Sequence, residues 1–171
     1  MRPDPAGGGS LSIEVELVAG RGRSWWPRPG RVFAAGQTHT FAQLAEAVDR
    51  AFGRWDLDHL RMFVLPGGVE VSWSAWQDGP AFPGTHDGRR ARLDLLTPGS
   101  CFAYVFDFGA DRTHLCTIRR VSGTTCPPAV PALRGSWGDG PEQHGRDTAD
   151  GTGHDAPAGL PPLLSSWRHL T

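Results

Sequence analysis

The segment Thr40–Gly53, TFAQLAEAVDRAFG, decides the fold. Thr40 is a suitable N-cap residue, Gln43 stands where it completes a capping box, and Gly53 supplies a C-terminal stop. The apolar side chains between these signals recur at the spacing of one helix face and are Phe41, Leu44, Val48, Ala51 and Phe52. The pattern predicts an amphipathic helix over residues 41–52 whose apolar face lies across a sheet.

Apolar runs on either side of this helix predict the strands of that sheet. The predicted strands are residues 11–18, 31–35, 60–65, 69–73, 101–107 and 114–121. Residues 101–107 carry apolar side chains on both faces, which is typical of a central strand. The tripeptide 66–68, Pro-Gly-Gly, separates two of the strands and indicates a β-hairpin. Residues 92–96 are expected to form a single helical turn.

This order of elements favours a two-layer α+β domain, with a mostly antiparallel sheet and one main helix packed across it. We place the domain at residues 11–121. Residues 1–10 are glycine-rich and are predicted to be a flexible leader. Residues 122–171 are rich in proline and glycine and are predicted to be an irregular extension of the domain.

The composition is that of a globular protein, and it excludes several chemistries. Arginine supplies all 17 basic residues against 18 acidic ones, so the formal net charge is −1. Without lysine the chain can form neither a Schiff base with a carbonyl substrate nor the lysine-containing loop of P-loop proteins. No apolar run suits a signal peptide or a membrane span, so we expect a cytoplasmic protein with no membrane partner.

The chain contains three cysteines, Cys101, Cys116 and Cys126. Their odd number and the lack of CxxC spacing argue against a disulfide framework and against a structural zinc site. We therefore predict no cofactor.

The first candidate site is a polar cluster around the turn that is expected before residue 114. Its members are Asp107, Asp111 and His114, joined by Asp56, Asp58 and His59 from the loop after the helix. The catalytic candidates are Asp107, Asp111 and His114, and the metal-ligand candidates are Asp58, His59, Asp107 and His114. Converging carboxylates and imidazoles can hold a divalent metal or act as acid and base. The alternative, which we favour, is that the two aspartates cap a tight turn with His114 packed in the same corner.

The second candidate site is the loop between residues 21 and 31, which contains no acidic residue. Its candidate nucleic-acid contacts are Arg21, Arg23, Trp25, Trp26, Arg28 and Arg31. Guanidinium groups bind phosphates and indoles stack on bases, so the loop can grip single-stranded nucleic acid. The arginines that can extend the patch are Arg89, Arg90, Arg92, Arg119 and Arg120. The alternative, favoured by the near-zero net charge, is that tryptophan packs on the sheet and the arginines are solvated.

Three segments in this order resemble the Ri-plasmid orf-three-like family, whose members are also labelled passenger TnpR proteins of an insertion element. The segments are TFAQLAEAVDRAFGRWDLDHLRMFVL (Thr40–Leu65), LDLLTPGSCFAYVFDFGADRTH (Leu93–His114) and TCPP (Thr125–Pro128). The resemblance covers roughly residues 11–145. It implies an α+β fold in a bacterial protein and no established activity.

The family shares a run of tyrosine, aspartate, phenylalanine, glycine and aspartate that is followed by a tryptophan and a histidine. The positions that match it are Phe106, Asp107, Phe108, Gly109 and His114. This chain departs from the run at Ala110, where an aspartate is expected, and at Arg112, where the tryptophan is expected. Serine-resolvase chemistry is not expected, because Ser10 precedes the first strand instead of ending it.

These observations leave three functions open. We expect a non-enzymatic interaction module that binds an unknown protein partner, because most signals in the sequence are structural. The alternative is a nucleic-acid-associated accessory protein of a mobile element. The second alternative is a metal-assisted hydrolase that uses Asp107 and His114.

Overall fold

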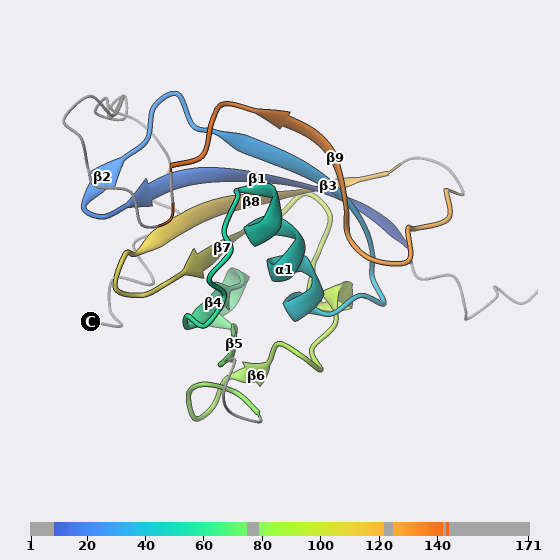
Figure 1. The fold of residues 1–171 in the computed structure, drawn as a ribbon. Helices are drawn as coiled ribbons and strands as arrows, with labels where there is room; N and C mark the ends of the chain where they lie inside the picture. Colours follow the sequence, from blue (N-terminus) through green and yellow to red (C-terminus); the bar gives the residue numbers. More distant parts are fainter. Residues whose placement is uncertain (1–8, 75–78, 122–124, 142, 144–171) are drawn as a thin grey trace, which may run out of the picture.

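The computed structural model describes residues 9–74, 79–121, 125–141 and 143 (Figure 1). Helix α1 (Phe41–Ala51) lies against one face of a nine-stranded sheet. The strands are β1 (Ser10–Gly20), β2 (Arg23–Ser24), β3 (Gly30–Gly36), β4 (Arg61–Val64), β5 (Glu70–Trp73), β6 (His86–Asp87), β7 (Cys101–Phe106), β8 (Arg112–Arg120) and β9 (Ala132–Trp137). Two 3-10 turns, η1 (Pro66–Gly68) and η2 (Leu93–Leu95), complete the described elements. The predicted α+β class is confirmed.

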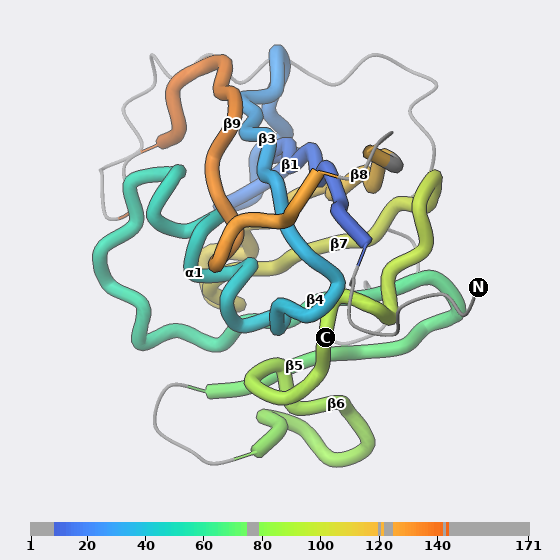
Figure 2. Tube along the Cα trace, turned by 90° about the vertical axis from the view of Figure 1, so that its right-hand side faces the viewer, coloured from blue at the N-terminus to red at the C-terminus, as the bar shows by residue number. Residues whose placement is uncertain are grey.

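The strand order is β6-β5-β4-β7-β8-β1-β3-β9, and β2 pairs with the end of β1. Figure 2 shows β9, β3 and β1 at the top and β5 and β6 at the bottom. Every neighbouring pair is antiparallel except β5 and β6, which run parallel. The sheet therefore ends at β9 on one side and at the two-residue β6 on the other.

The core fills the space between α1 and the sheet. Alternate residues of β1 point into it, and Leu11, Ile13, Val15 and Leu17 are each at most 1% exposed. The Phe63 ring of β4 lies 5.0 Å from the Phe41 ring of the helix, measured between centroids. The alternating apolar residues that predicted the first strand therefore lie on the face of β1 that packs against α1.

Both ends of α1 form as the sequence predicts. The Gln43 backbone N–H donates to Thr40 Oγ1 at 3.2 Å, and the Thr40 N–H donates to Gln43 Oε1 at 2.9 Å, which completes the capping box. At the other end, Phe52 is the C-cap residue, and Gly53 takes a left-handed φ of +72°. The helix spans 11 residues, and the described part of the chain holds no helix with the length and apolarity of a membrane span.

The predicted hairpin and central strand are also present. Strands β4 and β5 pair antiparallel around η1. Strand β7 lies between β4 and β8 in the interior of the sheet. The single helical turn expected near residue 93 is η2.

The sheet continues past residue 121, where the sequence predicts an irregular extension. Residues 132–137 form β9 and pair with β3 from Gly30↔Trp137 to Ala34↔Ala132. The sequence ALRGSW has no alternating pattern, and its pairing depends on contacts with distant residues. The Trp137 Nε1–H, for example, donates to the Arg28 carbonyl at 2.9 Å. The rest of the predicted extension, from residue 144, and most of the predicted leader lie outside the described residues.

Candidate functional site

Asp107 and Asp111 lie in the turn between β7 and β8, and both have a left-handed backbone, with φ values of +56° and +49°. Asp107 Oδ1 accepts hydrogen bonds from the backbone N–H groups of Gly109 at 3.1 Å and Ala110 at 3.4 Å. Aspartate tolerates this backbone conformation because its short side chain can bond to nearby main-chain groups. The geometry of Asp107 supports the interpretation that this residue caps the turn.

Part of the predicted polar cluster is assembled in the structure. His59 lies between two carboxylates, with Nδ1 3.6 Å from Asp107 Oδ1 and Nε2 3.4 Å from Asp56 Oδ2. The Asp58 backbone N–H donates to Asp56 Oδ1 at 3.3 Å, as in an Asx turn. Among the residues that the structure describes, no three histidine, cysteine or acidic side chains are placed to hold a metal ion.

His114, in contrast, lies apart from these carboxylates in a separate, fully buried network. Its Nε2 is 2.7 Å from Arg54 Nη2, and its Nδ1 is 3.0 Å from the Tyr104 carbonyl oxygen. A guanidinium only donates, so Nε2 is the acceptor and Nδ1 carries the proton that is donated to Tyr104. Burial, together with the charge of Arg54, holds the pKa of His114 well below its usual value. His114 is therefore a neutral interior residue.

Asp49 of α1 is the centre of this network and is 0% exposed. Its Oδ1 accepts from Arg54 Nη1 at 2.8 Å, and its Oδ2 accepts from the Tyr104 hydroxyl at 2.8 Å. Arg61 Nη1 lies 3.5 Å from the same Oδ2. Burial raises the pKa of Asp49, and the neighbouring Arg54 opposes this effect. The network ties the helix to β4 and β7.

Sequence reasoning missed Asp49, Arg54, Arg61 and Tyr104. Two signals were present. Asp49 interrupts a helix whose other inward residues are apolar, and Arg61 opens the otherwise apolar strand RMFV. Charged residues in such positions are almost never buried unless they are paired.

The loop between residues 21 and 31 divides into structural and exposed side chains. Arg31 is buried, and its guanidinium donates to the carbonyls of Gly30, Ala51, Trp137 and Gly138 at 2.7–3.0 Å. Trp25 packs partly buried against the core. Trp26 is 39% exposed, and the Arg28 guanidinium lies 5.8 Å from its ring centroid.

The remaining predicted nucleic-acid contacts are distributed over several elements of the fold. The Arg21 Nη2 group donates to the Gln143 carbonyl at 2.9 Å. Arg23 is half-buried in β2. Arg89, Arg90 and Arg92 follow β6, at the opposite end of the strand order from β9. Among these predicted contacts, the described pair that combines an exposed indole with a nearby guanidinium is Trp26 and Arg28.

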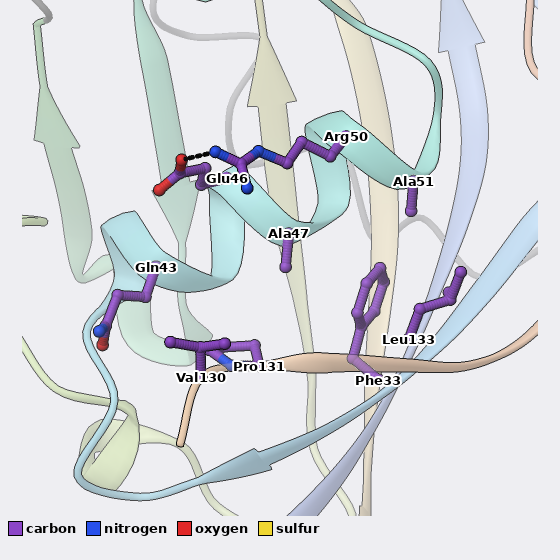
Figure 3. Close-up of a pocket in the computed structure, with 9 residues that line it drawn as sticks. All are labelled: Phe33, Gln43, Glu46, Ala47, Arg50, Ala51, Val130, Pro131 and Leu133. Carbon is purple, nitrogen blue, oxygen red and sulfur yellow. Dashed lines mark hydrogen bonds and ion pairs between the residues drawn. The ribbon is translucent and has the colours of Figure 1, made fainter. Parts of the chain in front are cut away.

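A groove of about 460 Å³ lies between α1 and β9 (Figure 3). Its apolar lining consists of Phe33, Ala47, Ala51, Val130, Pro131 and Leu133. Figure 3 shows the Phe33 ring rising from the sheet towards the helix, with Leu133 beside it. Gln43 and the ion pair of Glu46 with Arg50 form the polar rim on the helix side. Val130 and Leu133 are 56% and 49% exposed, so the groove presents apolar surface to solvent.

No family model and no curated protein sequence matches the chain. A crystal structure of a protein of unknown function from Methanosarcina mazei Go1 is similar in fold, with a TM-score of 0.53. The similarity covers 75% of this chain and 70% of that chain at 19% sequence identity. At this identity the similarity supports the α+β fold alone.

Proposed function

We propose that this chain is a non-enzymatic interaction module that binds an extended apolar segment of a partner protein along β9, with side chains of that segment in the groove beside α1. The observation that carries the proposal is an apolar groove next to a terminal strand of the sheet. On its sequence segments we also propose that the chain belongs to the Ri-plasmid orf-three-like family.

Strand β9 has the properties of a strand that accepts another. Within the described part of the chain it pairs only with β3, so its other side presents backbone N–H and C=O groups. An added strand would gain main-chain hydrogen bonds there, and alternate side chains would enter neighbouring pockets. The exposed side chains of Val130, Leu133 and Trp137 lie on or next to this strand. Affinity would come from the backbone, and selectivity from the groove.

The proposal is tested by selecting peptides and then removing the groove. Random linear peptides displayed on phage are selected on the purified protein, and the affinity of the enriched peptides is measured by fluorescence anisotropy. Burying a leucine contributes about 1.5–3 kcal/mol, so Leu133→Asp should weaken binding by more than about tenfold. Leu95→Asp is the matched control, because Leu95 is also exposed (47%) and lies outside the groove. If no peptide is enriched, or if both variants bind equally well, the proposal fails.

Nucleic-acid association is a second candidate, and it depends on Trp26 and Arg28. An exposed indole beside a guanidinium can stack on a base while the arginine contacts phosphate. The test is the anisotropy of labelled single-stranded oligonucleotides at about 50 and 200 mM salt, where phosphate-dominated binding changes steeply. Binding that survives Trp26→Ala combined with Arg28→Gln would rule out this surface.

A further inference from the structure

A second cavity, of about 350 Å³, lies on the other side of α1, between the helix and strands β4 and β5. Its polar lining comes from Arg61, Ser74, Arg89 and two residues of the helix, Gln43 and Glu46. Its apolar walls are Ala42, Leu57 and the indole of Trp73. The volume is within the range of sites that bind one small molecule.

Arg61 brings a buried positive charge to this cavity that is only partly compensated. The buried network behind it contains two guanidinium groups, from Arg54 and Arg61, and one carboxylate, from Asp49. Asp49 bonds to Arg54 at 2.8 Å and lies 3.5 Å from Arg61, which is beyond the usual length of a charge-assisted hydrogen bond. The Arg61 side chain is 9% exposed, so water solvates its charge poorly.

Two buried polar atoms of residues that line the cavity have no hydrogen-bond partner within the described part of the chain, the Nε–H of Arg61 and the hydroxyl of Ser74. Ser74 is 1% exposed and Arg61 is 8% exposed as whole residues. A buried donor without a partner costs about 1–3 kcal/mol, so most buried polar groups in native proteins are hydrogen-bonded to protein, water or a ligand. Both unpartnered atoms belong to residues that line the same cavity.

The surroundings hold these donors in place. The Arg61 guanidinium carbon lies 5.1 Å from the Trp73 ring centroid, in a cation–π contact that fixes the plane of the group. Arg89 Nη2 donates to the Ser74 carbonyl at 2.6 Å, which brings a second guanidinium to the lining. The carboxylate of Glu46 pairs with Arg50, which reduces its repulsion of an anion.

We propose that this cavity binds a small organic carboxylate. The carboxylate accepts hydrogen bonds from Arg61 Nε–H and Ser74 O–H, and its apolar part packs on Leu57 and Trp73. A monoanion balances the single excess charge of the buried network, and a planar carboxylate matches the edge of a guanidinium. The cavity shares Gln43 and Glu46 with the groove at β9, but Arg61 and Ser74 line the cavity alone, so either proposal can fail without the other.

The test is an NMR titration of the full chain with acetate, hexanoate, benzoate and succinate. Benzamide serves as the neutral counterpart of benzoate, and inorganic phosphate as the competing oxyanion. At least one carboxylate should bind with saturation, with a Kd tighter than about 10 mM. It should also shift the Arg61 Nε–H signal, which is assigned by its loss in Arg61→Lys.

Three variants locate the site. Ser74→Ala removes a hydroxyl that bonds to no described residue, so the fold should be retained while carboxylate binding weakens about two- to tenfold. Arg61→Lys should weaken binding at least about tenfold, because lysine lacks the planar donor edge. Arg119→Gln, which removes an exposed arginine away from the cavity, should bind as the wild type does.

Each contrary result overturns the proposal. If none of the four carboxylates saturates, the cavity is not a carboxylate site. Equal binding of benzamide and benzoate would mean that only the apolar walls bind, and tighter binding of phosphate would assign the cavity to another oxyanion. Unchanged affinity in folded Ser74→Ala would place any carboxylate elsewhere.

Discussion

Replacing Asp49 by asparagine should destabilise the protein strongly, although the change alters the size of the side chain very little. The substitution removes the carboxylate that accepts hydrogen bonds from Arg54 and Tyr104, each at 2.8 Å, and that lies 3.5 Å from Arg61. Two buried guanidiniums are then left without an anion. Breaking a buried ion pair by removing one partner costs about 3–5 kcal/mol. At about 2–4 °C per kcal/mol for a chain of this size, Tm should fall by roughly 6–20 °C.

The free energy of unfolding is measured by urea denaturation, followed by tryptophan fluorescence. Glu46→Gln is the matched control, because it also converts an acid to its amide in α1 but removes only an exposed i,i+4 pair with Arg50. Glu46→Gln should lower the free energy of unfolding by less than about 0.5 kcal/mol. The m value should be the same in both variants, since the surface exposed on unfolding does not change.

A double-mutant cycle that combines Asp49→Asn with Arg54→Met then isolates the interaction energy between these two side chains. Removing both partners should cost less than the sum of the single changes, with a coupling energy of about 1–3 kcal/mol. If Asp49→Asn costs no more than Glu46→Gln, the carboxyl of Asp49 is uncharged in the folded protein. The charge balance described for Arg61 and its cavity would then have to be revised.

Three further predictions concern the helix cap, a close contact and pH. Thr40→Ala removes the N-cap hydrogen bond from the Gln43 N–H and should lower the free energy of unfolding in urea by about 1 kcal/mol. An unchanged urea midpoint would contradict the capping role of Thr40. Gly88→Ala places a Cβ against the Trp73 ring and should lower the free energy of unfolding by about 1–3 kcal/mol. Gly135→Ala is the control and should be nearly neutral, because its Cβ would lie 3.8 Å from Val32. Equal losses of stability in the two variants would refute the close contact at Gly88. The pKa of His114 is lowered in the folded state, so below about pH 6.5 its imidazole takes up a proton in the unfolded chain but stays neutral in the folded protein. The free energy of unfolding therefore falls as the pH decreases, by up to about 1.4 kcal/mol per pH unit. Unfolding curves between about pH 7.5 and 5 should show a smaller slope for His114→Gln, and equal slopes would exclude His114 as the cause.

The sequence predicted the elements whose signals are local. The helix is marked within a few residues by Thr40, Gln43 and Gly53, and the first strand by its alternation. Strand β9 carries no such signal, because its pairing depends on β3, which lies about a hundred residues earlier in the chain. Short elements with long-range partners cannot be recognised from their own sequence.

The polar cluster shows the same limit. The turn-capping role of Asp107 follows from local geometry and was one of the interpretations that the sequence offered. His114 is only seven residues further along, yet its partners are Tyr104 across the sheet and Arg54 after the helix. The register of β7 against β8, in which Tyr104 faces His114, directs the imidazole into the interior. Nothing in the sequence near His114 specifies that register.

The position of β1 has a consequence for the order of events during synthesis. Its neighbour on one side is β8, with Leu11 opposite Arg120, so this pairing must wait until more than a hundred further residues have been made. At about 5–20 residues per second, a ribosome needs roughly 5–20 s to supply them. During that interval one edge of β1 lacks its partner strand, while β3 can already pair with the other edge and α1 can cover the apolar face. We therefore expect the nascent chain to be most prone to aggregation just before β8 emerges from the ribosome.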